Sequence, residues 1–181
     1  MNYLEIIAVT AGIISVFLTI KQNINCWLFG LVSCICLTFF YEQIHFYGQM
    51  ILQLVSIVQC IYGYINWNKI DNKNVGKIGI KKSLTLIAMC MLLGVLFTIA
   101  TNTNNDNWLY LDGVGGIIAL LATYLLIIKK IEAWWIFMIN NITLIVLCIH
   151  QHIYAIAFLN VLLFIISISG YKEWKKNLKQ A

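Results

Sequence analysis

The chain has 181 residues, of which 61% are hydrophobic and only 10% are charged. Soluble domains contain roughly 45–50% apolar residues, so this composition excludes a soluble domain of any size and indicates a membrane protein. The net charge of +5 fits membrane topology and lipid headgroups, and we do not interpret it as nucleic-acid affinity.

Long uncharged stretches follow one another along the chain, separated by short charged clusters. A helix needs about 20 apolar residues to cross the hydrocarbon core, and seven segments meet this need. We expect the first to stay in the folded protein, because no basic region precedes it and no small-residue cleavage pattern follows it. The chain is predicted to be an all-α polytopic membrane protein, with residues 1–181 in a single membrane domain. The expected spans are 4–20, 26–41, 46–65, 83–100, 108–128, 134–149 and 153–171.

All twelve basic residues are lysines. With seven spans every lysine falls on one side of the membrane, whereas an even number of spans would scatter them over both sides. The positive-inside rule makes this side the cytoplasm. We therefore expect the N-terminus outside and the C-terminus in the cytoplasm, in the plasma (inner) membrane of a bacterium. The lysines are Lys21, Lys69, Lys73, Lys77, Lys81, Lys82, Lys129, Lys130, Lys172, Lys175, Lys176 and Lys179.

The last third of the chain repeats the first third at the offset that takes Trp27 to Trp134 (134 − 27 = 107 residues). Shared Leu or Ile would be weak evidence in so apolar a sequence, but shared Trp, His, Tyr and Gly in one register are strong evidence. The aligned pairs are Trp27 and Trp134, His45 and His152, Tyr47 and Tyr154, Gly63 and Gly170, Tyr64 and Tyr171, and Trp67 and Trp174.

This repeat predicts how the spans are organised. Repeat one covers about 4–69 and repeat two about 108–176, while the helix at about 83–100 has no counterpart and serves as a linker. Two copies in the same orientation need one extra crossing between them, which explains the odd number of spans. The prediction is a SWEET-like 3+1+3 arrangement of parallel repeats, with the substrate site between the two halves.

The spans carry no Asp, Glu, Lys or Arg at mid-depth, where proton relays and ion-coupling groups are found. We therefore expect facilitated diffusion and no enzyme activity, with no catalytic residue and no cofactor. A membrane-embedded enzyme would need a carboxylate, His or Ser cluster inside the helices. His45 and His152 fall at turns between spans, where no third ligand completes a metal site.

Neutral amides remain at mid-depth. An amide in hydrocarbon costs several kcal/mol unless it is paired, so each one should face the interior of the bundle. Gln53 and Asn160 are related by the repeat offset and are candidate substrate ligands from both halves. The alternative for any such amide is a hydrogen bond that joins two helices. Asn141 aligns with Cys34, which predicts an asymmetric site.

Aromatic residues add to this candidate site. Trp134, Phe137 and Asn141 are spaced by three and four residues, so they lie along one helix face. Two rings and an amide could hold a flat heteroaromatic cation by stacking and cation–π attraction; the alternative is a packed core stripe. Trp67 and Trp174 are interpreted as members of the interfacial tryptophan belt.

These residues resemble a known family. The segment 134–141, WWIFMINN, resembles the WxxWxxxN motif of the PnuC-type vitamin transporters, and 170–176, GYKEWKK, resembles their C-terminal ending. Segments 27–30 and 47–53 look like the corresponding parts of the first half. The resemblance spans nearly the whole chain. The family is similar to SWEET transporters in its 3+1+3 build, with a different helix order within the repeats.

The resemblance implies an importer of nicotinamide riboside that works by facilitated diffusion with alternating access. It also implies a cytoplasmic kinase that phosphorylates and traps the substrate, and a homo-oligomer. Carried over by position, Trp134 and Asn141 match the motif, Gln53 matches the glutamine of the third helix, and Phe137 departs from the motif by replacing Trp.

Two alternatives stay open. Relatives in the same family transport thiamine, which also offers a flat cationic ring and a hydroxyl, and the change at Phe137 leaves the choice of vitamin undecided. A non-transporting membrane sensor or assembly subunit would need no catalytic signature. The duplicated amides at mid-depth favour transport.

Overall fold

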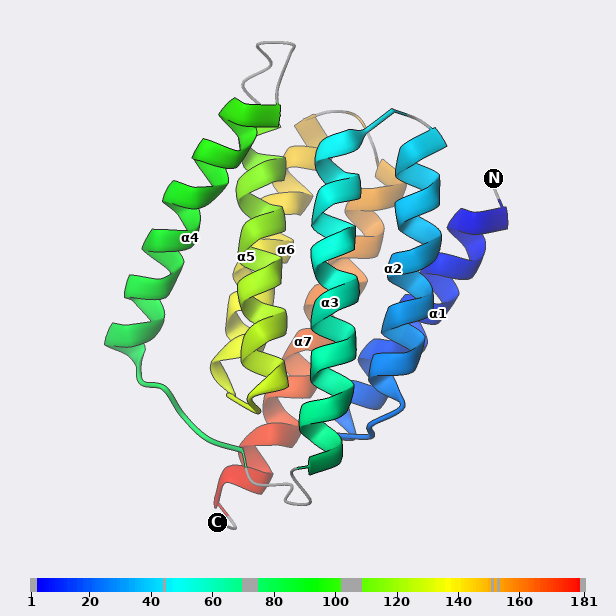
Figure 1. The fold of residues 1–181 in the computed structure, drawn as a ribbon. Helices are drawn as coiled ribbons and strands as arrows, with labels where there is room; N and C mark the ends of the chain where they lie inside the picture. Colours follow the sequence, from blue (N-terminus) through cyan, green and yellow to red (C-terminus); the bar gives the residue numbers. More distant parts are fainter. Residues whose placement is uncertain are drawn as a thin grey trace.

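The computed structural model describes residues 3–43, 45–69, 75–101, 109–150, 152 and 154–179. Over these residues the chain forms seven helices, and five of them (α1–α4 and α6) are long and apolar enough to cross a membrane. The predicted all-helical fold is confirmed (Figure 1). The helices are α1 (Tyr3–Ile20), α2 (Cys26–Gln43), α3 (Tyr47–Lys69), α4 (Ile80–Thr101), α5 (Leu109–Ile127), α6 (Glu132–His150) and α7 (Tyr154–Lys179).

The helix ends differ modestly from the expected spans. Helix α7 continues to Lys179, beyond the expected end at 171, because a helix does not have to stop where the hydrocarbon core stops. Its lysine-rich last turns extend the bundle at one end, and the N- and C-termini lie at opposite ends of it (Figure 1).

Six helices form a ring in which each packs against the next, in the order α1, α2, α3, α5, α6, α7 and back to α1. Helix α4 stands outside this ring and packs mainly against α5 (Figure 1). The repeat predicts two three-helix groups, which correspond to α1–α3 and α5–α7, and the seam between them consists of two contacts, α3 with α5 and α7 with α1.

The turns of the two three-helix groups match in detail. After α1, Gln22 takes φ 53°, and after α5, Lys129 takes φ 51°. In both places the next residue donates its N–H to the carbonyl five residues back, at 2.9 Å and 2.8 Å, which is the Schellman way of ending a helix. On the opposite end His45 (φ 56°) and His152 (φ 57°) follow α2 and α6, and each ring is hydrogen-bonded to the tyrosine two residues later at 3.1 Å.

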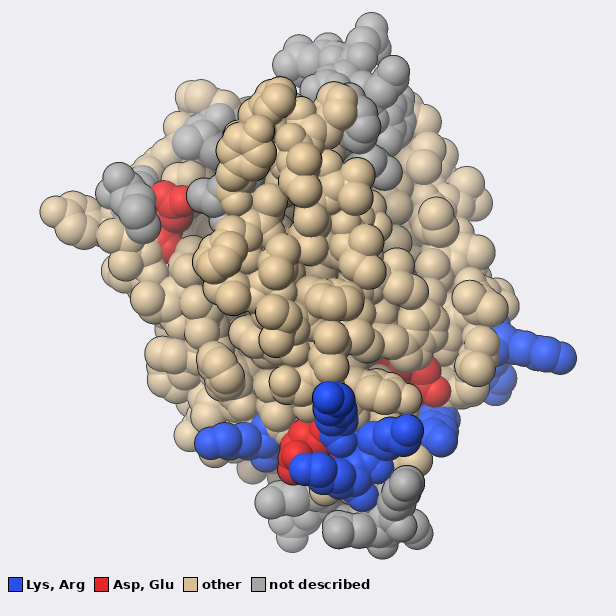
Figure 2. All heavy atoms as spheres, turned by 180° about the vertical axis from the view of Figure 1, so that it is seen from behind, with Lys and Arg blue, Asp and Glu red and all other residues tan. Residues whose placement is uncertain are grey.

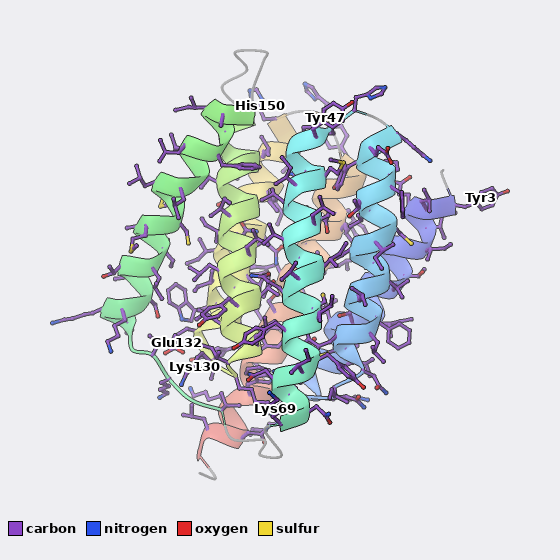
Figure 3. The ribbon with its side chains drawn as sticks, viewed as in Figure 1. Tyr3, Tyr47, Lys69, Lys130, Glu132 and His150 are labelled. Atoms are coloured by element: carbon purple, nitrogen blue, oxygen red, sulfur yellow. The ribbon has the colours of Figure 1, made fainter. Side chains whose placement is uncertain are left out.

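Lysines gather at one end of the bundle (Figure 2). Lys69, Lys130 and Glu132 lie at this end, whereas Tyr47 and His150 lie at the other (Figure 3). We call it the lysine-bearing end. Lys73, which we also expect on the cytoplasmic side, lies outside the described residues.

Trp67 and Trp174 are not interfacial, and their assignment to a tryptophan belt was wrong. They are 5% and 0% exposed and belong to the main hydrophobic core of the bundle. Distance along a helix placed both residues near the membrane surface, but they lie on the inward faces of α3 and α7. There each one donates a hydrogen bond to a carbonyl of the other three-helix group.

Candidate functional site

A cavity of about 370 Å³ lies inside the ring of helices. All six ring helices contribute lining residues, and α4 contributes none among the residues described. This volume falls in the range of small-molecule sites, roughly 300–1,000 Å³. The cavity therefore sits between the two three-helix groups, where the sequence predicts a substrate site.

Many lining residues come in pairs related by the offset of 107 residues. Paired positions on both sides show that the cavity straddles the seam between the two groups and is not a gap within either. The pairs are Val16 and Thr123, Thr19 and Leu126, Trp27 and Trp134, Cys34 and Asn141, Ser56 and Leu163, and Cys60 and Ser167.

The chemistry of the two sides differs. The amides that line the cavity, Asn140, Asn141 and Asn160, all come from α6 and α7, as does the half-buried Phe137. The aligned positions in α2 and α3 carry Gly30, Ser33, Cys34 and Gln53. An asymmetric ligand with one amide-seeking end would therefore have a defined orientation between the two sides.

Four of the five residues singled out in the sequence line this cavity: Trp134, Phe137, Asn141 and Asn160. Gln53 is half-buried on α3 and is not among the lining residues. Leu52, Ser56 and Cys60 recur every four residues along one face of α3, and Ser56 and Cys60 line the cavity. Gln53 is seven residues before Cys60, so it lies on nearly the same face of α3 but about 10 Å further along the helix axis.

Three buried polar atoms of the lining have no hydrogen-bond partner within the described part of the chain. They are Trp27 Nε1, Trp134 Nε1 and Asn140 Oδ1. Their residues are 5%, 2% and 4% exposed. Buried polar groups in proteins are nearly always paired, so two donors and one acceptor of the lining residues lack the partner that such groups usually have.

Trp27 and Asn140 were not chosen as site residues from the sequence. The repeat alignment contained the signal for Trp27, because Trp27 aligns with Trp134. Asn140 precedes the motif residue Asn141 and lies on the same helix. One turn of helix is wide enough for both side chains to reach the cavity.

No charged side chain is among the described residues of the lining. Within the described chain, no group of three or more His, Cys, Asp or Glu residues could hold a metal ion. The arrangement offers hydrogen bonds, aromatic surface and sulfur contacts, which are the means of holding a small organic molecule reversibly.

Comparison with known proteins identifies the family of the chain. The model of the family described as "Nicotinamide mononucleotide transporter" matches residues 2–176. The chain belongs to this transporter family. The "Nicotinamide riboside transporter PnuC" of Haemophilus influenzae is 29% identical over 99% of this chain and 82% of its own length. The protein of that name from Escherichia coli K12 is 20% identical over 99% of this chain and 88% of its own.

The fold has a counterpart among solved structures. The "Crystal structure of the Vitamin B3 transporter PnuC" superposes with a TM-score of 0.78, at 23% identity, over 98% of this chain and 83% of that one. Membership of the PnuC family, which the segment 134–141 predicts, is thereby confirmed. The chain is a transporter of the PnuC type with membrane-spanning helices.

Proposed function

We propose that this protein imports nicotinamide riboside and that the cavity between its two three-helix groups is the substrate site. The observation that carries the proposal is the uncharged cavity, which has amides on one side and lies across the seam. Phe137 offers its ring to the flat cationic pyridinium. Asn141 and Asn160, which line the cavity, hydrogen-bond the carboxamide in this proposal.

The lining favours a riboside over a mononucleotide. A phosphate carries about two negative charges at neutral pH and is bound in proteins by Arg, Lys or clustered backbone N–H groups. The described lining contains no lysine, and the chain has no arginine. Moving a phosphate into this cavity would cost its hydration without a compensating charge.

The proposed mechanism is facilitated diffusion by alternating access. Helices α1–α3 and α5–α7 act as parallel repeats in a 3+1+3 arrangement, with α4 as the linker, and rock about the substrate. The lysine-bearing end faces the cytoplasm of a bacterium, so the N-terminus lies outside. A cytoplasmic kinase then traps the product by phosphorylation, and the protein works as a homo-oligomer.

Thiamine is the second candidate substrate. The feature that favours it is Phe137, which stands where the family motif has a tryptophan and changes the size of the stacking surface. Thiamine lacks a carboxamide, so Asn141 would contribute less to its binding. The two vitamins are separated by titrating both into the purified protein.

The test of the proposal is binding and uptake of nicotinamide riboside by purified protein and proteoliposomes. We expect Asn141→Ala to weaken binding by about tenfold, as the loss of one buried hydrogen bond predicts. Gln53→Ala is the matched comparison, since it removes an amide that does not line the cavity, and we expect a smaller effect. Wild-type protein that binds neither vitamin would overturn the assignment, and equal losses in both variants would remove the distinction between the two amides.

A further inference from the structure

Two tryptophans meet the cavity at its lysine-bearing end. Trp27 and Trp134 lie in the first turns of α2 and α6, beside Thr19 and Leu126 in the last turns of α1 and α5. Asn141 is seven residues further along α6 than Trp134, which is about 10 Å along the helix axis. The indoles therefore form the floor of the cavity, and the amides lie above them.

One side of each indole packs against a neighbouring helix. A Cβ atom built on Gly63 would lie 2.6 Å from the ring carbons of Trp27, and one on Gly170 would lie 2.4 Å from those of Trp134. The rings pack edge-to-face against Trp67 and Trp174, with centroids 5.3 Å and 5.5 Å apart. These contacts come from α3 for Trp27 and from α7 for Trp134 and leave less ring face for stacking a ligand, and the two N–H donors have no partner within the described residues.

The floor also offers acceptors. Ser15 Oγ donates its proton to the carbonyl of Cys26 at 2.7 Å, and Thr19 Oγ1 donates to the carbonyl of Ser15 at 2.8 Å. Both hydroxyl protons are committed, so toward a ligand in the cavity that these residues line the two oxygens can act only as acceptors. The indole N–H donors come from both three-helix groups, and the hydroxyl acceptors come from α1. This combination suits a ligand group that carries several hydroxyls.

We infer that this floor is a ribose site, with Trp27 as a substrate-binding residue and Trp134 as a hydrogen-bond donor. The inference rests on the proposed function. The two indole N–H groups donate to ribose oxygens, and the Ser15 and Thr19 oxygens accept from ribose hydroxyls. The carboxamide end then points toward Asn141, and the pyridinium ring lies between these levels, against Phe137.

The test compares nicotinamide riboside with 1-methylnicotinamide, which keeps the cationic ring and the carboxamide but has no sugar. Binding to Trp27→Phe and Thr19→Val is measured by calorimetry. Phe keeps an aromatic ring in the Trp27 site, and Val has nearly the shape of Thr, so at least one variant should fold. We expect each variant to bind the riboside about tenfold more weakly and 1-methylnicotinamide within about twofold of wild type. Asn141→Ala is the matched control and should weaken both ligands.

The 2′-, 3′- and 5′-deoxy ribosides provide the same comparison if 1-methylnicotinamide binds too weakly to measure. At least one deoxy riboside should bind the wild-type protein more weakly than nicotinamide riboside does. In Trp27→Phe, that deoxy riboside and nicotinamide riboside should bind equally well. Equal losses for ligands with and without the sugar, or no loss, would overturn the ribose site while the transporter assignment stands. Failure of wild type to bind the riboside would overturn both.

Discussion

Two glycines set the position of the indoles at the floor of the cavity. Gly63 on α3 and Gly170 on α7 let the helix backbones approach Trp27 and Trp134 more closely than any other residue would permit. The approach is the same in both three-helix groups, and the tryptophan one turn further along the same helix, Trp67 or Trp174, packs edge-to-face with the indole. A small residue on one helix therefore fixes where a donor on another helix points.

We predict that Gly63→Ala destabilises the protein by about 1–3 kcal/mol, the usual cost of overpacking a core. The new methyl group would lie 2.6 Å from the Trp27 ring, so the indole must move. Thermal unfolding in detergent with added lipid measures the loss, and Gly170→Ala should match it. Val58→Ala on the exposed face of α3 is the control. A Gly63→Ala protein as stable as wild type would show that the indole is free to shift.

At this scale the sequence predicted part of the cavity lining, for identifiable reasons. Trp134, Phe137 and Asn141 share a helix face that spacing alone reveals, and the structure places all three on the cavity. Trp27 was missed because a tryptophan near a helix end is expected at a membrane interface. The burial of a tryptophan and its hydrogen-bond partners decide whether it lies at the membrane interface or lines a cavity. Both depend on helices that are distant in the sequence.

Among the elements, the segment before α4 is attached to the turn between α5 and α6. The N–H groups of Ile78 and Gly79 donate to Glu132 Oε1 at 2.8 Å and 3.1 Å, and the N–H of Gly76 donates to the carbonyl of Lys129 at 3.0 Å. Glu132 is 5% exposed. One carboxylate thus ties the linker to the start of α6, which carries Trp134.

We predict that Glu132→Ala lowers stability by about 2–3 kcal/mol, because two backbone donors lose a charged acceptor. Glu132→Gln keeps a carbonyl oxygen within reach and should lose less. Thermal unfolding gives the order of the three proteins, and hydrogen exchange at residues 76–79 locates the loss. The exposed Glu173, which pairs with Lys176 at 2.8 Å, is the control carboxylate, and its change to Ala should have little effect. The idea fails if the Glu132 and Glu173 variants are equally stable.

The helices themselves were predictable, since long uncharged runs separated by lysine clusters mark where each one lies in the sequence. The attachment of residues 75–79 was not, because it joins positions more than 50 residues apart through a side chain that is unremarkable in the sequence. The matching turns at Gln22 and Lys129 were also not predictable from the local sequence. Neither residue type favours positive φ, so only the repeat alignment could link the two turns.

Across the whole molecule, the two three-helix groups hold each other by reciprocal hydrogen bonds at the lysine-bearing end. Trp67 Nε1 on α3 donates to the carbonyls of Leu126 and Ile127 on α5, at 3.2 Å and 3.0 Å. Trp174 Nε1 on α7 donates to the carbonyl of Thr19 on α1 at 3.2 Å. Thr19 and Leu126 also line the cavity floor. These bonds therefore close the cavity toward the lysine-bearing end.

The alternating access proposed above requires this end to open, so breaking the bonds should favour the open state. Trp67→Phe and Trp174→Phe keep an aromatic ring in the core and remove the donors. One lost hydrogen bond is worth about 1 kcal/mol, which predicts a roughly fivefold rise in amide exchange at 17–20 of α1 and 124–127 of α5. Trp135→Phe, which changes a half-buried tryptophan of α6, is the control. Unchanged exchange in both variants would mean that the two groups part elsewhere, whereas a rise confined to these helix ends would place the gate beneath the substrate.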